Sequence, residues 1–489
     1  MIKSIVMRSA AIIVLLVFSV NTIETWACSS IIVGKSASAN GYVMLGHTED
    51  ISPQPVINQH KLPRKQHEPG EITTLPRGGQ LNQIEQTWAC IWSEVPGEDF
   101  CDGFLNEWGV TIASDRCPSR EGTSDLTEEG IGRMLRRLVA RRATTAREGV
   151  KLAGELVEKF GYYSTGRTYA ICDPDEGWVF CAIQGRRWLA RRVPDDHVAV
   201  IANSYTVREI DLADTLNFLA AADLVDYATS RDWYDPDKDS VFDFAGVYAD
   251  SGAAAASYNV CRQWSGLRYV VNDTVHANWA NLPFSLKADR KMGVLDVMEI
   301  LRHHYENTAL YQLPSEISSP HESQFMTTCS RRSQMSFVAE LRADRPKEVG
   351  FVYWLSLGKP CYSYLVPFYF GMDRFPDAYY TQSDVPDSAL VSRMITAERP
   401  SDFEPAFLKF CNYSHHVDSN YAALGQPARR AQFEHDNRTM ETRDEVEASA
   451  AELLESDREQ AIAKLVSFSE ERYLAALKSM DDVLAETDK

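Results

Sequence analysis

The sequence lacks several patterns that would point to a cofactor. It contains no P-loop, no dinucleotide-binding glycine pattern, no internal repeat and no low-complexity tract within its 489 residues. It also has no CxxC pair and no His/Cys cluster at metal-ligand spacing. The sequence therefore gives no support for a metal site.

Positive charge and long apolar runs are also scarce. Lys and Arg total 50 against 69 Asp and Glu, which gives a formal charge of -19 at pH 7. Such an acidic chain is a poor match for nucleic acid or an anionic membrane, so we expect no nucleic-acid partner. The one marked apolar run, Ala10 to Phe18, is shorter than the roughly 20 residues that a membrane-spanning helix needs.

Residues 1–27 have the layout of a secretory signal peptide. Lys3 and Arg8 form a positive head before the apolar run, and Thr25 and Ala27 form a small-x-small cleavage site. We expect signal peptidase to cut after Ala27 and the mature protein to be exported, either periplasmic or secreted. No membrane attachment is expected after that cleavage.

Such a cut would make Cys28 the first residue of the mature chain. An amino-terminal cysteine carries a thiol and a free α-amine together. The thiolate is a nucleophile whose thiol has a pKa of about 8.5, and the amine, with a pKa of about 7.7–8.0, can accept the thiol proton. This pair of groups suits attack on an amide carbonyl.

Two other interpretations of Cys28 stay open at this stage. It can be a structural cysteine, because buried cysteines are often inert. It can also be the acylated cysteine of a lipoprotein, although Thr25 and Trp26 stand where such signals usually have an aliphatic and a small residue. An acylated sulfur could not attack a substrate.

The residues after Cys28 predict a β-hairpin. Two strand-like runs flank a turn signal: Ser29–Ala37, Ala39-Asn40-Gly41 and Tyr42–His47. A hairpin returns its far end to its near end, so Glu49 and Asp50 should lie beside Cys28. Either carboxylate could hold the ammonium group or orient a substrate. Alternatively, Asp50 merely closes a turn before Pro53.

Further elements predict a layered α+β protein. The helical pattern of Thr127–Phe160 breaks near Thr145, which can cap the second helix with Glu148. Two more helices are predicted at Leu212–Ala228 and at Leu295–Tyr305, with His303-His304 exposed or capping at the end of the latter. The charged stretch at about 441–489 predicts a helical tail.

Four strand-like runs follow the first helical region: Thr168–Cys172, Trp178–Gln184, Arg187–Arg192 and His197–Asn203. The last run ends at Asn203. Its side-chain amide could donate a hydrogen bond to a developing oxyanion. The alternative is that Asn203 ends the strand by bonding to its own backbone.

A set of motifs in order along the chain resembles a known family. They are Cys28-Ser29-Ser30-Ile31-Ile32-Val33-Gly34-Lys35, Thr48-Glu49-Asp50, Ala143–Tyr162, Asp173-Pro174, Arg192–Asp196 with Ala202-Asn203, Asp296-Val297-Met298, Ser336-Phe337-Val338, Gly358-Lys359-Pro360 and Val366–Tyr369. The chain is similar to the cysteine-type dipeptidases of the N-terminal nucleophile hydrolase superfamily. These form the bacterial dipeptidase A family, which includes the secernins.

The resemblance implies a four-layer αββα sandwich of two stacked antiparallel sheets, formed by residues 28–489 as one dipeptidase domain. It implies amide hydrolysis by Cys28, without metal or cofactor. Asp50 would hold the α-amine and Asn203 would serve the oxyanion. Asn106 would be a second oxyanion donor, and Arg262 would contact the substrate.

One position departs from the family pattern. Many relatives carry Arg where this chain has His47, next to Thr48-Glu49-Asp50. If that Arg tunes the thiol, His47 could replace it only when protonated.

Three functions follow as hypotheses. The first is an exported dipeptidase that acts on dipeptides or short peptides through a thioester. The second is an amidase with the same mechanism that acts on N-acyl amino acids or related amides. The third is an exported binding protein or lipoprotein without turnover. The sequence leaves a homo-oligomer open in each case.

Overall fold

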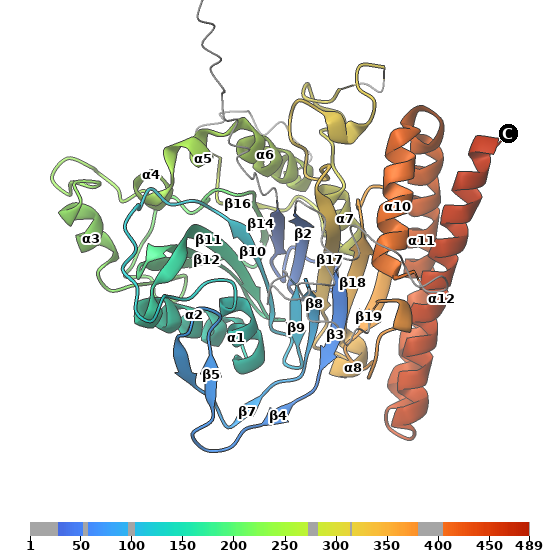
Figure 1. The fold of residues 1–489 in the computed structure, drawn as a ribbon, viewed down its shortest axis with the longest axis horizontal. Coiled ribbons are helices and arrows are strands. Elements are labelled where there is room, and N and C mark those ends of the chain that lie inside the picture. Colours follow the sequence, from blue (N-terminus) through green and yellow to red (C-terminus); the bar gives the residue numbers. More distant parts are fainter. Residues whose placement is uncertain are drawn as a thin grey trace, which may run out of the picture.

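The structure is a computed structural model that describes residues 28–51, 57–95, 103–271, 282–312, 315–379 and 404–488. The predicted signal peptide, residues 1–27, lies outside these ranges. Figure 1 shows strands at the centre of the molecule, with helices at the periphery. None of the described helices is long and apolar enough to cross a membrane.

The first sheet has seven strands, and every pairing in it is antiparallel. Their order across the sheet is β16 (Ser285–Lys287), β14 (His197–Ile201), β1 (Ser29–Val33), β2 (Met44–Asp50), β17 (Ser333–Leu341), β18 (Phe351–Leu357) and β19 (Val366–Tyr369). The strand that follows Cys28 is therefore central, with β14 on one side and β2 on the other.

The second sheet has eight antiparallel strands. Their order is β15 (Phe218–Ala220), β13 (Trp188–Arg192), β12 (Gly177–Gly185), β11 (Tyr162–Cys172), β10 (Thr111–Arg116), β9 (Phe104–Asn106), β8 (Cys90–Glu94) and β3 (Asn58–Leu62). Two short ladders join β4 (Lys65–Gln66) to β7 (Gln86–Thr87), and β5 (Ile72–Thr74) to β6 (Gln80–Asn82).

The two sheets pack face to face between two helical layers. Strands β1 and β2 contact β10 and β11 of the other sheet. Helices α6 (Ser257–Val271) and α7 (Val294–Leu301) cover the first sheet, and α1 (Leu135–Arg142) and α2 (Ala146–Phe160) cover the second (Figure 1). The predicted four-layer αββα sandwich is confirmed.

Local sequence signals explain the α1–α2 pair. The Thr145 side chain accepts a hydrogen bond from the backbone N–H of Glu148, 3.1 Å away, so it caps α2 as predicted. Gly161 ends α2 at φ +77°, a conformation that glycine adopts without the strain of a side chain. The predicted break and cap at Thr145 are confirmed, whereas the first helix begins at Leu135 and not at Thr127.

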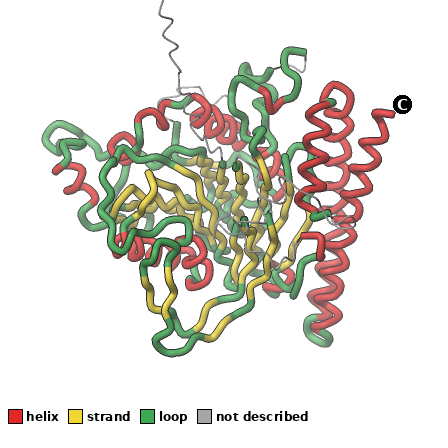
Figure 2. Tube along the Cα trace, in the orientation of Figure 1, coloured by secondary structure: helices red, strands yellow, loops and turns green. Residues whose placement is uncertain are grey.

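The carboxy-terminal helices begin earlier than the sequence predicts. The predicted tail starts at about residue 441, whereas three helices run from residue 406: α10 (Ala406–Ser419), α11 (Tyr421–Leu453) and α12 (Arg458–Leu484). They stand side by side against the β18–β19 end of the first sheet (Figure 2). Buried ion pairs attach α11 to the sandwich: Glu447 to Arg342 at 2.7 Å and Asp436 to Arg302 at 2.6 Å.

One predicted helix is wrong. Leu212–Ala228 contains a turn, the strand β15 and only the start of α3 (Leu224–Ser230), because Phe218–Ala220 pairs with β13 at the sheet edge. The remaining helices are short: α4 (Phe244–Tyr248), α5 (Ser251–Ala255), α8 (Lys347–Gly350), η1 (Pro320–Glu322), η2 (Asp377–Tyr379) and η3 (Ala485–Asp488).

Candidate active site

The β1–β2 hairpin brings two carboxylates to Cys28. Ser29 pairs with Thr48, so the strand ends place Cys28 beside Glu49 and Asp50. The Cys28 Sγ lies 3.4 Å from Glu49 Oε1 and accepts a long hydrogen bond, 3.5 Å, from the backbone N–H of Asp50. The predicted hairpin is confirmed, although its strands end at Val33 and begin at Met44, which leaves a longer connection than a tight turn.

Asp50 is held by hydroxyl groups inside the first sheet. Its carboxylate accepts hydrogen bonds from Ser333 Oγ at 2.8 Å, from Thr48 Oγ1 at 3.3 Å and from Ser330 Oγ. Asp50 belongs to β2 and pairs with Ser333, so it does not merely close a turn. Burial raises its pKa to about 6, against the opposing effect of these hydrogen bonds.

Arg262 connects Cys28 to two asparagines. Its Nη1 donates to the Cys28 carbonyl oxygen at 2.9 Å and to Ser29 Oγ at 3.0 Å. Its Nη2 donates to Asn203 Oδ1 at 2.8 Å and to Asn259 Oδ1 at 2.9 Å. The guanidinium is almost fully buried. This fork of donors fixes the start of β1 relative to α6.

Asn203 lies just beyond β14 with φ +47°, a left-handed conformation that asparagine tolerates better than most residues. Its Nδ2 donates to the Arg116 carbonyl oxygen at 3.0 Å, and its Oδ1 accepts from Arg262. An amide nitrogen carries two hydrogens, so one is left to donate to another acceptor. The alternative that the Asn203 side chain bonds to its own backbone does not hold, because both of its partners are distant in sequence.

His47 is neutral in this environment. Its Nδ1 lies 2.9 Å from Ser30 Oγ, which donates to Asp115 Oδ2 at 2.6 Å. Burial lowers the pKa of His47 to about 4, with the charges of Arg136 and Arg167 acting in the same direction and Asp115 opposing them. A neutral His47 does not supply the positive charge that a protonated side chain would bring to this position.

Two arginines from the second sheet and its helical layer surround Glu49 with positive charge. Arg136 of α1 and Arg167 of β11 both donate to Ser114 Oγ, at 3.1 and 2.9 Å. Burial raises the pKa of Glu49 to about 7, and these two guanidiniums oppose that rise. The sequence analysis did not single out either arginine, since no local motif marks them.

The environment favours the neutral form of the thiol. Burial raises the pKa of Cys28 well above its ordinary value, and the charges of Glu49, Asp50 and Asp115 raise it further. A nucleophilic Cys28 therefore needs a base in direct reach.

Asn106 is not brought to this group, so its predicted role as oxyanion donor is wrong. Its Nδ2 donates to the carbonyl oxygens of Ala140 and Ala143, at 2.9 and 2.8 Å, which uses both amide hydrogens. Asn106 also lies beyond the Thr111 end of β10, whereas Asp115, near the other end, contacts Ser30. At about 3.3 Å per residue the two ends are roughly 15 Å apart.

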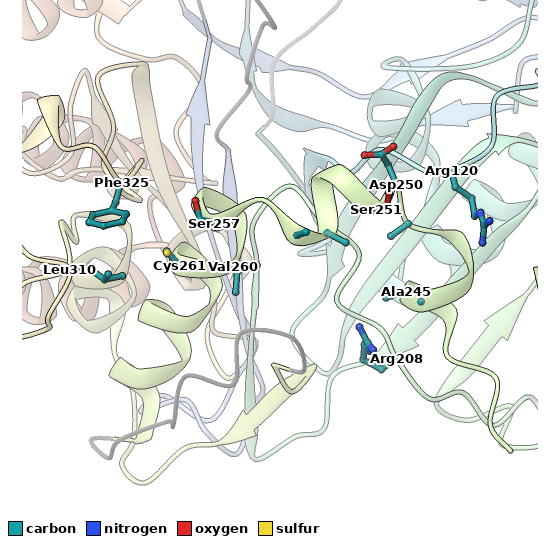
Figure 3. A pocket seen from close by; sticks show the side chains of 14 residues that line it. Arg120, Arg208, Ala245, Asp250, Ser251, Ser257, Val260, Cys261, Leu310 and Phe325 are labelled. Carbon is teal, nitrogen blue, oxygen red and sulfur yellow. The ribbon is translucent and has the colours of Figure 1, made fainter. Parts of the chain in front are cut away.

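A cavity of about 1060 Å³ lies beside the amino-terminal part of α6, and its lining does not include Cys28, Glu49, Asp50 or Arg262. Figure 3 shows Leu310 and Phe325 on one side, Arg120, Arg208 and Asp250 on the other, and the α6 side chains between them. One of those α6 residues is Cys261, which directly precedes Arg262. The cavity thus combines apolar walls with both signs of charge.

A second buried group escaped the sequence analysis. His304, His321, Cys329 and Cys361 converge so that their ligand atoms all lie within 4.8 Å of one another. The prediction of no metal site rested on spacing along the chain, and these residues come from four separate segments. The prediction that His304 is exposed or caps a helix is wrong, because it is 5% exposed. Cys28, His47 and Glu49 also have ligand atoms within 4.8 Å of one another.

Comparison with known proteins gives the family. Residues 122–395 match the model described as Peptidase family C69. That match spans more than half of the chain, so the protein belongs to Peptidase family C69 and is a peptide-bond hydrolase. The resemblance noted in the sequence is confirmed.

Curated relatives carry dipeptidase names. The chain is 27% identical over 378 residues to a probable dipeptidase of Latilactobacillus sakei, which covers 73% of this chain and 77% of the relative. It is 29% identical over 370 residues to a probable dipeptidase of Salmonella dublin, with 71% and 82% covered. The solved structure of a mutant conjugated bile acid hydrolase from Clostridium perfringens aligns at 10% identity and a TM-score of 0.31, with 70% and 92% covered.

Proposed function

We propose that the protein is an exported cysteine dipeptidase whose nucleophile is the amino-terminal Cys28 of the mature chain. The observation that carries this proposal is the convergence of Glu49, Asp50 and Arg262 on Cys28 at the start of a central strand. The relatives named as dipeptidases support the substrate class.

The mechanism begins with proton transfer from the Cys28 thiol to its free α-amine. The thiolate attacks the scissile carbonyl carbon, and the tetrahedral oxyanion accepts a hydrogen bond from Asn203 Nδ2. The protonated amine gives its proton to the leaving amine, and the C–N bond breaks to leave a thioester. Water then attacks the thioester with the amine as base, which releases the acid product and restores the thiol.

The raised pKa of Cys28 makes the amine essential to this scheme. Burial and three nearby carboxyl groups hold the thiol neutral until a base removes its proton. The carboxylate of Asp50 is fixed by Ser330, Ser333 and Thr48, and would stabilise the ammonium form of that amine. Any residue left before Cys28 would convert the amine to an amide and remove the base.

The charge pattern of the cavity is consistent with a dipeptide. A dipeptide has an ammonium group and a carboxylate close together, and the cavity presents Arg120 and Asp250 on the same side (Figure 3). An N-acyl amino acid has the carboxylate and an apolar acyl group but no ammonium group. Dipeptides are therefore the preferred substrates in this proposal.

The experiment compares mature protein beginning at Cys28 with protein that keeps one extra residue before it. Both are assayed with free dipeptides, N-acetylated dipeptides and N-acyl amino acids. We expect only the first form to be active, with free dipeptides as its best substrates. Equal activity of the two forms would contradict the amino-terminal mechanism, and preference for acyl-amides would favour the amidase.

Cys28→Ser completes this test, with Cys172→Ser as the control at a buried free cysteine in β11. We expect loss of hydrolysis only at Cys28. Amino-terminal sequencing and intact mass of the protein exported by its native host test maturation. An unmodified amino-terminal Cys28 is expected, whereas lipid on its sulfur would favour the lipoprotein interpretation.

A further inference from the structure

The buried group of two histidines and two cysteines has the geometry of a metal centre. His304 Nε2 lies 3.2 Å from His321 Nε2. The latter nitrogen lies 3.2 Å from Cys329 Sγ and 3.3 Å from Cys361 Sγ. With metal–nitrogen bonds of about 2.0–2.1 Å and metal–sulfur bonds of about 2.3 Å, tetrahedral geometry puts ligand atoms about 3.3–3.8 Å apart. The observed separations lie close to that range.

The outer nitrogens of both imidazoles are held by carboxylates. His304 Nδ1 lies 3.0 Å from Glu306 Oε1, and His321 Nδ1 lies 2.7 Å from Asp418 Oδ1. A carboxylate can only accept a hydrogen bond, so each Nδ1 carries the hydrogen. In a neutral imidazole this leaves a lone pair on Nε2. Carboxylates in this position orient many metal-binding histidines.

When both imidazoles are neutral, their two Nε2 lone pairs face each other across 3.2 Å in this buried site. Both cysteines are fully buried, and the histidines are 5% and 8% exposed. Two neutral Nε2 atoms cannot hydrogen-bond to one another, but a cation between them would be attracted to both. Thiolate sulfur and imidazole nitrogen in a tetrahedral set of two plus two is a ligand set typical of zinc.

We propose that His304, His321, Cys329 and Cys361 bind a structural zinc ion. All four positions are filled by protein atoms, which distinguishes a structural from a catalytic zinc site. The Cys28, His47 and Glu49 group is a weaker candidate, because it offers only three ligand atoms. Its single histidine has a serine hydroxyl, Ser30 Oγ, and not a carboxylate beside Nδ1.

The ion would fasten a long irregular segment to the first sheet. His304 follows α7, His321 lies in η1, Cys329 precedes β17 and Cys361 follows β18. Apart from η1, the described part of the segment between Leu301 and Ser333 has no helix or strand. Loops of this length with so little secondary structure are uncommon in compact domains and are usually functional or disordered, and a bound ion would fix this one.

The segment also contacts the group around Cys28 through Ser330. Leu310 and Phe325 line the cavity (Figure 3), and Ser330 Oγ donates to the Asp50 carboxylate. Cys329 is the residue before Ser330. A zinc ion bound at Cys329 would therefore keep Ser330 and one cavity wall in place without taking part in the reaction.

The primary experiment measures metal in the full-length mature protein. The protein is expressed with zinc in the medium and analysed by elemental mass spectrometry after gel filtration. We expect about one zinc per chain. Replacement by Co²⁺ should give the intense visible bands of tetrahedral cobalt with thiolate ligands. Absence of zinc together with absence of these bands would overturn the proposal.

Variants assign the ion to this site. Cys361→Ser and His304→Ala should each lose most of the zinc. Cys28→Ser and Cys411→Ser should keep it, because the first belongs to the other group and the second is a buried cysteine outside both. Loss in Cys28→Ser with retention in Cys361→Ser would place the ion at the active site instead. The wild-type measurement does not depend on whether a variant folds.

A disulfide between Cys329 and Cys361 is the competing outcome. Alkylation without reduction, followed by peptide mass analysis, distinguishes it from two thiolates. A Cys329–Cys361 disulfide in the exported protein would overturn the proposal. Two alkylated cysteines only after zinc removal by a chelator, together with a lower melting temperature of the stripped protein, would support it.

Discussion

Arg262 Nη1 lies 2.9 Å from the carbonyl oxygen of Cys28, so helix α6 directly holds the residue that precedes strand β1. The same guanidinium also donates to Asn203 Oδ1. One buried side chain thus sets the distance between the proposed nucleophile and the proposed oxyanion donor.

Arg262→Lys should lower kcat with a smaller change in KM. Lysine keeps the charge, but a single ammonium cannot replace a planar fork that reaches four acceptors. We expect a loss of about tenfold to a hundredfold in kcat. Arg268→Lys, on the same helix and half-exposed, is the matched control. Unchanged kcat in a folded Arg262→Lys protein would contradict the role assigned here.

Asn203→Asp should remove the oxyanion donor at nearly unchanged side-chain size, although it also removes the hydrogen bond to the Arg116 carbonyl oxygen. Aspartate tolerates φ +47° and still accepts from Arg262, but it has no N–H to donate. We expect kcat for a dipeptide to fall by about 10²–10³. Asn307→Asp is the control, because Asn307 also has a left-handed backbone, at φ +59°. Asn203→Gly distinguishes amide loss from strain, since glycine accepts this backbone freely.

Glu49→Gln should flatten the pH dependence of stability. The pKa of Glu49 is about 7 in the folded state against 4.5 as its reference value, because burial disfavours the charged form. The folded state therefore binds more protons between these values, and its contribution to stability is lost as the pH rises through about 7. This shift corresponds to about 3 kcal/mol.

Urea denaturation at pH 5 and pH 8 measures this effect. The wild-type free energy of unfolding should fall from the lower to the higher pH, and the fall should be smaller by about that amount in Glu49→Gln. Asp50 and Asp115 have pKa values raised in the same direction, so a residual fall should remain. The exposed Glu155→Gln on α2 should behave as wild type.

Arg167→Gln should move the acidic limb of the kcat/KM profile to higher pH. Arg167 is buried, and its charge favours a nearby Cys28 thiolate. Removal of that charge makes deprotonation of the thiol harder, by on the order of one pH unit. The rate of iodoacetamide alkylation against pH checks the thiol directly. Arg167→Lys should restore much of the profile, whereas an unmoved limb in Arg167→Gln would contradict the electrostatic role.

Arg120→Ala should raise KM for dipeptides more than it lowers kcat. Arg120 lines the cavity and packs over the Trp233 ring, with 4.7 Å from its guanidinium carbon to the ring centroid, so it presents a positioned charge. Loss of a carboxylate contact that is equal in ground and transition states changes KM alone. A rise of about tenfold is expected, and dipeptide amides should show little change on the same substitution. Arg77→Ala, outside this cavity's lining, is the control.

Local signals in the sequence predicted the elements that depend on neighbours in the chain. The hairpin that returns Glu49 and Asp50 to Cys28 follows from two strand-like runs around Asn40-Gly41. The cap at Thr145 follows from a serine/threonine-type residue three positions before an acidic one. In both cases the interacting residues are close in sequence, so the local sequence pattern is enough to predict the contact.

Contacts between distant segments could not be predicted in the same way. Asn106 looked available as a donor, yet α1 and the residue after it supply two carbonyl oxygens that occupy its amide hydrogens. Leu212–Ala228 has helical periodicity, yet a free sheet edge pairs with Phe218–Ala220. The His/Cys group has no signature in the chain because its four members meet only after β17 and β18 are in place.

The two buried ion pairs of α11 limit how far the chain can be shortened from its carboxy-terminal end, whether in an expression clone or by a premature stop codon. Arg342 and Arg302 belong to the sandwich, and their partners Glu447 and Asp436 belong to α11. A chain that stops before residue 436 would lose both carboxylates together with the helices that pack over this side of the sheet, and removal of one partner of a buried ion pair costs about 3–5 kcal/mol. Clones trimmed to the family-matched core should therefore yield insoluble protein, and a purification tag is better attached after residue 489 than substituted for the last helices.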